Sequence, residues 1–121
     1  KFKDYIEYSP NIARSLIPAL IQDTDLMIQT SEGENFGSSI AEALACGVPV
    51  VIGPTNGTKD FIDEGGFVFS KYTPEAILDC IERCMEVINK DLTLIREKAR
   101  TAALNHFDVK KIIYNFETII K

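Results

Sequence analysis

Two glutamates, Glu34 and Glu42, have a spacing and setting that could hold a ligand. Between them lies Gly37, followed by Ser38. A glycine lets the backbone approach a ligand closely, and the free amide groups at a helix start attract anions. A carboxylate accepts hydrogen bonds in pairs, which suits the neighbouring hydroxyl groups of a sugar or a ribose. Residues 34–42 are therefore predicted to bind a phosphorylated ligand that carries hydroxyl groups.

The flanking sequence predicts a strand, a loop and a helix around this segment. Residues 25–29 favour a strand, residues 30–35 a polar loop, and residues 38–46 a helix that Gly47 ends. Residues 48–52 form a β-branched run without alternation, which is typical of a strand covered on both faces. Because ligands of parallel sheets bind beyond the carboxyl ends of the strands, the loop with the first glutamate has the expected position.

The other segments extend the same alternating pattern. Residues 5–8 predict a short strand, and a helix is expected to begin near Ile17, with Pro18 in its first turn. The remaining predicted elements are a short helix over 59–64, a strand over 67–69, and three helices capped by Thr73, Asp91 and Asp108. Alternating short strands and helices predict an α/β fold, a Rossmann-like parallel sheet flanked by helices.

Length and composition narrow the class of protein. The 121 residues fit one domain, over 1–121, and 45% of them are hydrophobic, enough for an ordinary core. The net charge of −5 argues against general nucleic-acid binding, which needs a basic face. The apolar runs are too short for a membrane span, and residues 1–20 do not resemble a signal peptide. A cytoplasmic location is the resulting expectation.

The cysteines and the single histidine predict no metal site. Cys46, Cys80 and Cys84 do not form a disulfide framework, and two thiols four residues apart without further ligands make a poor zinc site. We therefore expect buried, inert cysteines and a reducing compartment. His106 has no evident partner cluster and is predicted to be a surface residue at a helix end.

The residues around the two glutamates resemble the signature of the group 1 (family 4) retaining glycosyltransferases, which have the GT-B fold. Seven residues separate the glutamates, Phe-Gly occupies positions 36–37, and Glu-Ala-Leu-Ala-Cys-Gly-Val-Pro-Val-Val fills positions 42–51. The likeness continues in register through residues 17–28 on one side and through 56–75 on the other. This resemblance implies an incomplete C-terminal, donor-binding half of a GT-B enzyme.

The family resemblance also implies roles for individual residues. Glu42 would accept hydrogen bonds from the ribose hydroxyls of a UDP-, GDP- or ADP-sugar, and Glu34 would be a catalytic residue on the donor-sugar side. Backbone N–H groups would hold the diphosphate or the sugar hydroxyls, at Asn35, Phe36, Gly37 and Ser38. Such enzymes transfer the sugar with retained configuration to a glycan or lipid-linked acceptor. They usually do so without a metal cofactor, so protein dipoles and cations must stabilise the leaving diphosphate.

Some family features are changed or lie elsewhere. Asn35 stands where glycine or proline is usual, and Asn56 and Asp60 replace a glycine and a glutamate of the later loop. In the family, an Arg/Lys pair that clamps the diphosphate lies upstream of the segment matched here, and the acceptor-binding half is separate. The resemblance therefore implies that this chain alone is inactive. It also implies that the parent enzyme serves glycan or capsule assembly. Peripheral association of the parent enzyme with a membrane is compatible with this role.

Several alternatives remain open at this stage. Ser39 and Glu42 also fit a capping box, in which the glutamate would bond back to the Ser39 backbone N–H. Glu34 could be a solvated loop carboxylate, and Phe36 is expected to pack rather than to stack on a ligand. The function could also be that of another GT-B enzyme, such as a sugar-nucleotide epimerase or a phosphorylase, or of a non-enzymatic α/β module.

The ends of the chain carry one further expectation each. A strand over residues 5–8 would leave an exposed sheet edge, which predicts edge pairing or a homodimer. The predicted last helix, residues 109–120, has a strongly apolar face. In complete GT-B enzymes the C-terminal helix crosses toward the other half, so part of this face would have its partner there.

Overall fold

The computed structural model describes residues 3–120. Its sheet has three short parallel strands in the order β1-β2-β3: β1 (Met27–Gln29), β2 (Val50–Ile52) and β3 (Gly66–Val68). Each strand pairs with the next over all three of its residues. Because the strands are parallel, their carboxyl ends meet at one edge of the sheet. The α/β class predicted from the sequence is confirmed.

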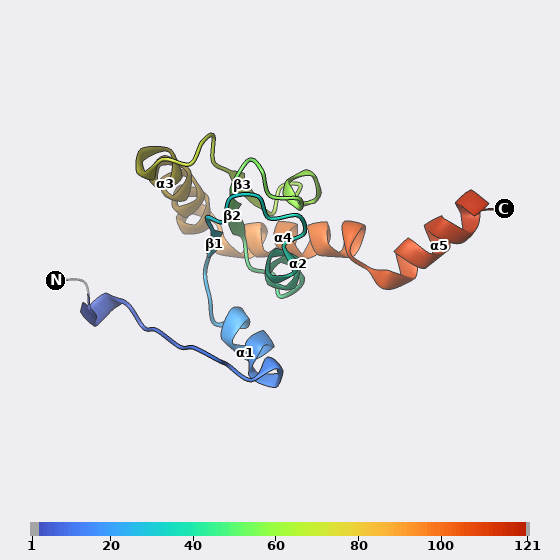
Figure 1. Ribbon diagram of the computed structural model, residues 1–121, viewed down its shortest axis with the longest axis horizontal. Helices are drawn as coiled ribbons and strands as arrows, with labels where there is room; N and C mark the ends of the chain where they lie inside the picture. Colours follow the sequence, from blue (N-terminus) through green and yellow to red (C-terminus); the bar gives the residue numbers. More distant parts are fainter. Residues whose placement is uncertain (1–2, 121) are drawn as a thin grey trace.

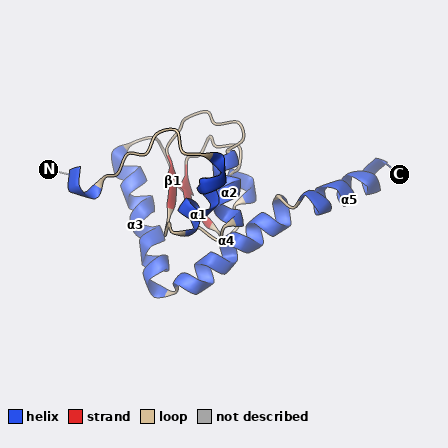
Figure 2. Cartoon of the chain, turned by 90° about the horizontal axis from the view of Figure 1, so that it is seen from below, coloured by secondary structure: helices blue, strands red, loops and turns tan. Residues whose placement is uncertain are grey.

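Helices cover both faces of this sheet (Figures 1 and 2). The α-helices are α1 (Ile17–Gln22), α2 (Ser38–Ala45), α3 (Pro74–Lys90), α4 (Leu92–His106) and α5 (Val109–Ile120). The 3-10 turns are η1 (Lys3–Tyr5), η2 (Arg14–Leu16) and η3 (Lys59–Phe61). Figure 2 shows α3 on one side of the sheet and α1 with α2 on the other. The starts of α1, α2 and α3 agree with the sequence predictions.

The core consists of two clusters, one on each face of the sheet. On the α2 face the buried residues include Ile40, Leu44 and Ile52, all fully shielded from solvent. On the α3 face they include Val51 and Phe69, also fully shielded. Helix α4 contributes to both clusters and thereby ties the two layers together. The alternation of β2 side chains between the two clusters is what a strand covered on both faces requires.

Side-chain caps begin the last three helices, as their sequences predict. The Thr73 hydroxyl accepts a hydrogen bond from the Ala76 amide at 3.3 Å, and the Asp91 carboxylate accepts one from the Leu94 amide at 3.0 Å. The Asp108 carboxylate accepts a bond from Lys110 N–H at the start of α5. These caps satisfy amide groups that a helix start would otherwise leave unpaired.

Two predictions of secondary structure from the sequence are wrong. Residues 5–8 form no strand: η1 ends at Tyr5, irregular backbone follows, and the tyrosines Tyr5 and Tyr8 are 86% exposed. Among the described residues, no neighbouring strand pairs with residues 5–8, and β1 is the edge of the sheet. The predicted edge pairing through residues 5–8 therefore loses its basis. The helix predicted over 59–64 is reduced to η3, since Asp63 adopts a left-handed backbone with φ of +46°.

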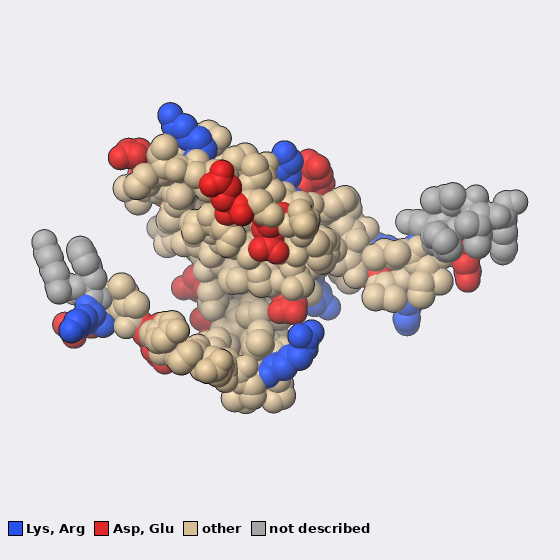
Figure 3. Space-filling view, viewed as in Figure 1, with Lys and Arg blue, Asp and Glu red and all other residues tan. Residues whose placement is uncertain are grey.

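Both ends of the described chain project from the body. Residues 3–13 run away from the sheet, and α5 continues beyond α4 (Figure 1). On α5 the side chains of Val109, Ile112 and Ile113 are at least half exposed. Within residues 3–120 no helix is long and apolar enough to cross a membrane. On the face in Figure 3, Lys and Arg are scattered among Asp and Glu and form no basic stripe.

Candidate functional site

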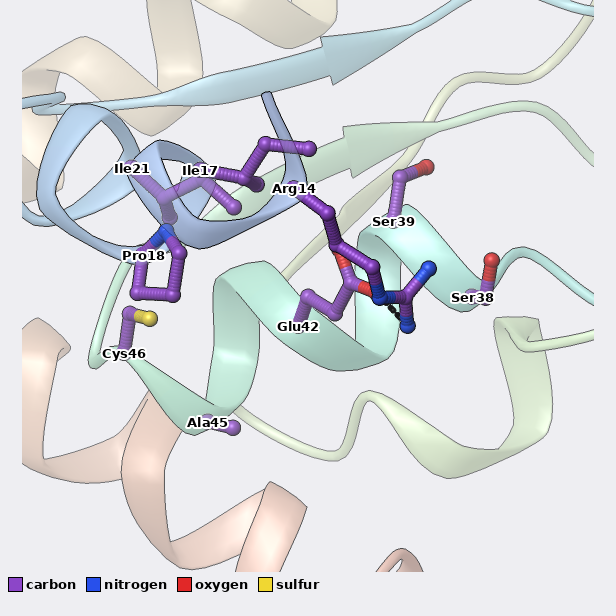
Figure 4. A pocket seen from close by; sticks show the side chains of 9 residues that line it. All are labelled: Arg14, Ile17, Pro18, Ile21, Ser38, Ser39, Glu42, Ala45 and Cys46. Atoms are coloured by element: carbon purple, nitrogen blue, oxygen red, sulfur yellow. Dashed lines mark ion pairs between the residues drawn. The ribbon is translucent and has the colours of Figure 1, made fainter. Parts of the chain in front are cut away.

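A cavity of about 410 Å³ separates α1 from the first turns of α2 (Figure 4). The α1 side is apolar, with Ile17, Pro18 and Ile21. The α2 side is polar near the start of the helix, and its side chains are smaller toward the end of the helix. It contributes Ser38, Ser39, Glu42, Ala45 and Cys46. Arg14, in η2, completes the lining. The cavity thus pairs a water-excluding wall with a helix N-terminus.

Glu42 directs its carboxylate into this cavity (Figure 4). The carboxylate is 42% exposed and lies 3.9 Å from the guanidinium of Arg14, whose side chain is 93% exposed. An ion pair this long and solvated contributes little to stability. Both charged groups therefore remain available to a ligand.

The capping-box interpretation of Glu42 is wrong. The N-cap of α2 is Gly37, which makes Ser39 the second helical residue, and no side chain caps this helix. A capping box needs its serine at the N-cap. Glycine suits this N-cap because a Cβ there would come within 3.2 Å of both the Gln29 side chain and Ile40, where the chain turns tightly against the end of β1.

The amide groups at the start of α2 differ in availability. Ser38 N–H donates to the Phe36 carbonyl at 3.1 Å, so this amide, predicted to face the ligand, is already engaged. For the amides of Gly37 and Ser39, no acceptor lies in hydrogen-bond range among residues 3–120. Unpaired amides at a helix start form an anion site. Ser39 lines the cavity, whereas Gly37 is buried and lies outside the lining, so the site offers a free donor at position 39.

The loop with Glu34 is fixed by the two neighbouring loops. Gly57 N–H donates to the Glu34 carbonyl at 2.8 Å. Gly33 N–H donates to the Thr55 hydroxyl at 3.1 Å, and this hydroxyl lies 2.5 Å from the Tyr72 hydroxyl. A Cβ on Gly57 would overlap the Asn35 carbonyl, so only glycine fits there. The backbone of Glu34 is thus held at the carboxyl edge of the sheet.

The structure does not bring all predicted site residues into one cavity. Ser38 and Glu42 line the cavity between α1 and α2. Glu34 lies in the preceding loop, half-buried, outside that lining. Asn35 contributes its carbonyl to the contact with the later loop. Of the two glutamates of the signature, Glu42 therefore lies in the cavity, and Glu34 lies outside it in the loop before α2.

A polar network behind α2 was not predicted. Asn56, only 1% exposed, donates from Nδ2 to Oε1 of Gln29 at 2.7 Å. Its Oδ1 accepts from the Thr58 amide at 2.9 Å and from the Thr58 hydroxyl at 2.6 Å. Gln29 Nε2 in turn lies 3.3 Å from the Ser39 hydroxyl. The one sequence signal for this network was that Asn56 stands where the family usually has a glycine.

Phe36 packs as the sequence analysis expected. Its ring is 54% exposed and meets Phe107 edge-to-face, with centroids 6.0 Å apart. Phe107 also contacts Phe61, and next to it His106 Nε2 lies 2.8 Å from Oδ2 of Asp63. His106 ends α4, as the sequence predicted, and the fold gives it one partner that the sequence did not reveal, 43 residues away.

The cysteines differ from one another. Cys80 and Cys84 are fully buried, as predicted. Burial raises the pKa of both thiols, that of Cys84 to about 11. Cys46 is only partly buried and lines the cavity. Within the part of the chain that the structure describes, no group of three His, Cys, Asp or Glu residues could hold a metal ion.

Comparison with known proteins defines the class. The family model described as glycosyl transferases group 1 matches residues 1–101. The chain therefore belongs to the group 1 glycosyl transferases, as the sequence signature implied. The family match gives no support to the alternative of a non-enzymatic α/β module.

Individual relatives agree with this class. N-acetyl-alpha-D-glucosaminyl L-malate synthase of Bacillus anthracis is 32% identical over 108 residues, which are 85% of this chain and 27% of that protein. Anabaena HepE in complex with UDP has a TM-score of 0.72 and 32% identity over 88% of this chain and 30% of that one. HepE has also been solved with UDP-glucose.

A more distant structure agrees on the fold. Sucrose-phosphate synthase of Thermosynechococcus elongatus has a TM-score of 0.79 at 20% identity, over 98% of this chain and 30% of that one. The fold is that of GT-B glycosyltransferases. The chain spans less than a third of the length of each of these three relatives.

Proposed function

We propose that this chain forms the donor-binding part of a glycosyltransferase and binds a nucleoside diphosphate sugar in the cavity between α1 and α2. The observation that carries the proposal is the position of Glu42. Its carboxylate lies in a 410 Å³ cavity, one turn after a helix start with unpaired amides, within the family signature. Acceptors for hydroxyl groups and donors for phosphates are thereby combined in one site.

The ribose and the diphosphate of such a donor each find a counterpart. Glu42 accepts hydrogen bonds from two neighbouring ribose hydroxyls, since a carboxylate can serve both at once. The diphosphate takes the amide at position 39 and the positive end of the α2 dipole. Arg14, at the rim of the cavity, adds a cation. These groups stabilise the departing diphosphate, and no metal is required for that step.

Glu34 is proposed to serve the sugar rather than the nucleotide. It lies outside the cavity lining, at the carboxyl edge of the sheet, with its backbone held by Gly57. A carboxylate at that point can bind hydroxyls of the donor sugar while Glu42 holds the ribose. Transfer is proposed to proceed with retention, to a glycan or lipid-linked acceptor that the rest of the parent enzyme binds. Catalysis then requires the parent enzyme, which we propose to be cytoplasmic.

Isothermal titration of the full-length protein with UDP, GDP and ADP tests the nucleotide site. UDP is the first choice, because HepE was solved with UDP and with UDP-glucose. We expect Glu42→Ala to weaken the binding of the preferred nucleotide about tenfold or more, since it removes charged hydrogen bonds worth roughly 1.5–3 kcal/mol. Glu82→Ala, at an exposed position of α3, is the matched control and should bind as wild type does.

Two outcomes would contradict the proposal. One is equal affinity of wild type and Glu42→Ala for the preferred nucleotide, which removes Glu42 from the site. The other is the absence of binding by wild type to all three nucleotides, which removes the nucleotide site itself.

A further inference from the structure

The turn that leads to Glu34 has little packing of its own. Its residues Ser31, Glu32 and Gly33 are exposed. Gly33 has a left-handed backbone with φ of +78°, and apart from its chain neighbours no heavy atom lies within 4 Å of the position that a Cβ would occupy. Because nothing packs against the turn at this point, its conformation depends on hydrogen bonds to other loops.

Thr55 and Tyr72 supply these hydrogen bonds from the loops after β2 and β3. Gly33 N–H donates to Oγ1 of Thr55 at 3.1 Å, and the Tyr72 hydroxyl donates to the Ser31 carbonyl at 3.3 Å. The two hydroxyl oxygens lie 2.5 Å apart. All three contacts are satisfied at once when Thr55 donates to the phenol oxygen and the phenol donates to the carbonyl, which can only accept. We call these three contacts the hydroxyl clasp.

The core holds the ring of Tyr72 in place. The ring meets Phe69, which is fully buried, edge-to-face, with centroids 5.2 Å apart. Gly53, directly after β2, leaves the space for the phenol, since a Cβ there would overlap the Tyr72 hydroxyl. The phenol therefore reaches from the loop after β3, past the loop after β2, to the loop after β1.

We propose that Tyr72 and Thr55 are positioning residues that hold Glu34 in place for the donor sugar. The hydroxyl clasp fixes the backbone at positions 31 and 33, and Gly57 N–H donates to the Glu34 carbonyl at 2.8 Å. The backbone that carries the Glu34 side chain is thus ordered before a ligand arrives, which lowers the cost of ordering it on binding. This inference rests on the proposed function, in which Glu34 binds hydroxyls of the sugar.

The hydroxyl clasp lies apart from the proposed nucleotide cavity. None of its residues, Ser31, Gly33, Thr55 and Tyr72, belongs to the lining between α1 and α2. Glu42, the proposed ribose contact, lies in that lining and makes no contact with the clasp among the hydrogen bonds of residues 3–120. Loss of the clasp should therefore lower the affinity for the sugar part of the donor and preserve that for the nucleotide part.

Titrations of the full-length protein with a nucleoside diphosphate and with its sugar conjugate test this separation. The nucleotide is the one that wild type prefers among UDP, GDP and ADP, and the conjugate is the preferred one of its glucose, galactose and N-acetylglucosamine derivatives. We expect Tyr72→Phe, which keeps the ring against Phe69, to weaken binding of the conjugate about fivefold and to leave binding of the nucleotide unchanged. Tyr114→Phe makes the same chemical change at an exposed position of α5 and should bind both ligands as wild type does.

Variants of Thr55 test the other half of the clasp. Thr55→Val removes the hydroxyl and should also weaken binding of the conjugate about fivefold. Thr55→Ser keeps the hydroxyl and should restore the affinity to within about twofold of wild type. Thermal unfolding of each variant verifies that the fold is retained.

A double-mutant cycle tests whether the clasp acts through Glu34. In the Glu34→Ala background, we expect Tyr72→Phe to weaken binding of the conjugate less than about twofold, against about fivefold in wild type. A fivefold loss in both backgrounds would show that Tyr72 acts on the ligand independently of Glu34 and would overturn the positioning role.

The outcomes also separate this inference from the proposed function. Equal affinity of Tyr72→Phe and wild type for the conjugate overturns the inference alone. A parallel loss for the free nucleotide also overturns it, since the effect would then not depend on the sugar. If Glu34→Ala binds the conjugate as tightly as wild type does, the proposed role of Glu34 fails and the inference fails with it. If wild type binds none of the three nucleotides, the proposed nucleotide site itself is overturned.

Discussion

The two faces of the sheet are covered in different ways. On one face, the 17-residue helix α3 lies directly on the strands. Its Cys80 and Cys84 are fully buried there, together with Val51 of β2. On the other face, α1 has only six residues, none of them buried, and a cavity separates it from α2. The strands on this second face are covered by α2, whose Ile40 and Leu44 are fully buried, while the short helix α1 lies across the cavity from it. Both faces therefore hold a buried cluster, and the α2 face also has the cavity in which we propose that the ligand binds.

Helix α4 connects these two faces. Its Ile95 belongs to the cluster beneath α3, and its Ala99 belongs to the cluster beneath α2. Arg100 donates a hydrogen bond to the Ala45 carbonyl at the end of α2. Gly47, with φ of +73°, passes close to the Arg96 carbonyl. Helix α4 therefore joins α2, which lines the cavity, to the cluster beneath α3.

The largest effect that separates the two faces is expected for Ile88→Ala. Ile88 lies on α3, is 7% exposed and belongs to the cluster beneath that helix. Truncating it leaves a cavity, so we expect a loss of about 2–3 kcal/mol in the free energy of unfolding, measured by urea denaturation. The nucleotide affinity of the folded variant should equal that of wild type. A large loss of affinity without loss of stability would contradict the division of roles.

A smaller effect is expected from alkaline pH acting on the same face. Burial raises the pKa of Cys84 to about 11, above the value of about 9 in the unfolded chain. Below pH 9 the thiol is protonated in both states and its contribution to stability is complete. Between about pH 9 and 11 the unfolded state releases the proton while the folded state retains it, so stability falls.

Thermal or urea unfolding at pH 8 and pH 10 measures this alkaline effect. Wild type should lose about 1 kcal/mol more between the two pH values than Cys84→Ala does, because the variant lacks the titrating thiol. An equal loss in both proteins would mean that Cys84 does not titrate differently on folding.

The parts of the fold predicted from the sequence are those governed by local signals. Caps at Thr73 and Asp91, and the glycine after α2, mark helix ends through contacts only a few residues long. The family signature located the segment that carries Glu42 in the same way. Residues 5–8 had a local strand pattern as well, but a strand also needs a neighbouring strand to pair with. Within residues 3–120 these four residues have none, and the sequence alone does not reveal that.

The features that the sequence did not reveal depend on distant contacts. The Ser-x-x-Glu pattern that suggested a capping box does not form one, since the N-cap of α2 is Gly37, two residues before Ser39. Gln29 and Asn56 meet across 27 positions because β1 and β2 end at the same edge of the sheet. Neither residue belongs to a motif of its own, and only the register of the strands brings them beneath Ser39.

The most direct test of the account is an NMR titration of the full-length protein with UDP that compares the two faces. Backbone amide signals of Ser39 and Glu42 should shift as UDP saturates the protein, because these groups surround the proposed phosphate and ribose positions. The amide signals of Cys80 and Cys84 on α3 should remain in place. Saturable binding that moves the α3 signals and leaves those of α2 unchanged would contradict the account.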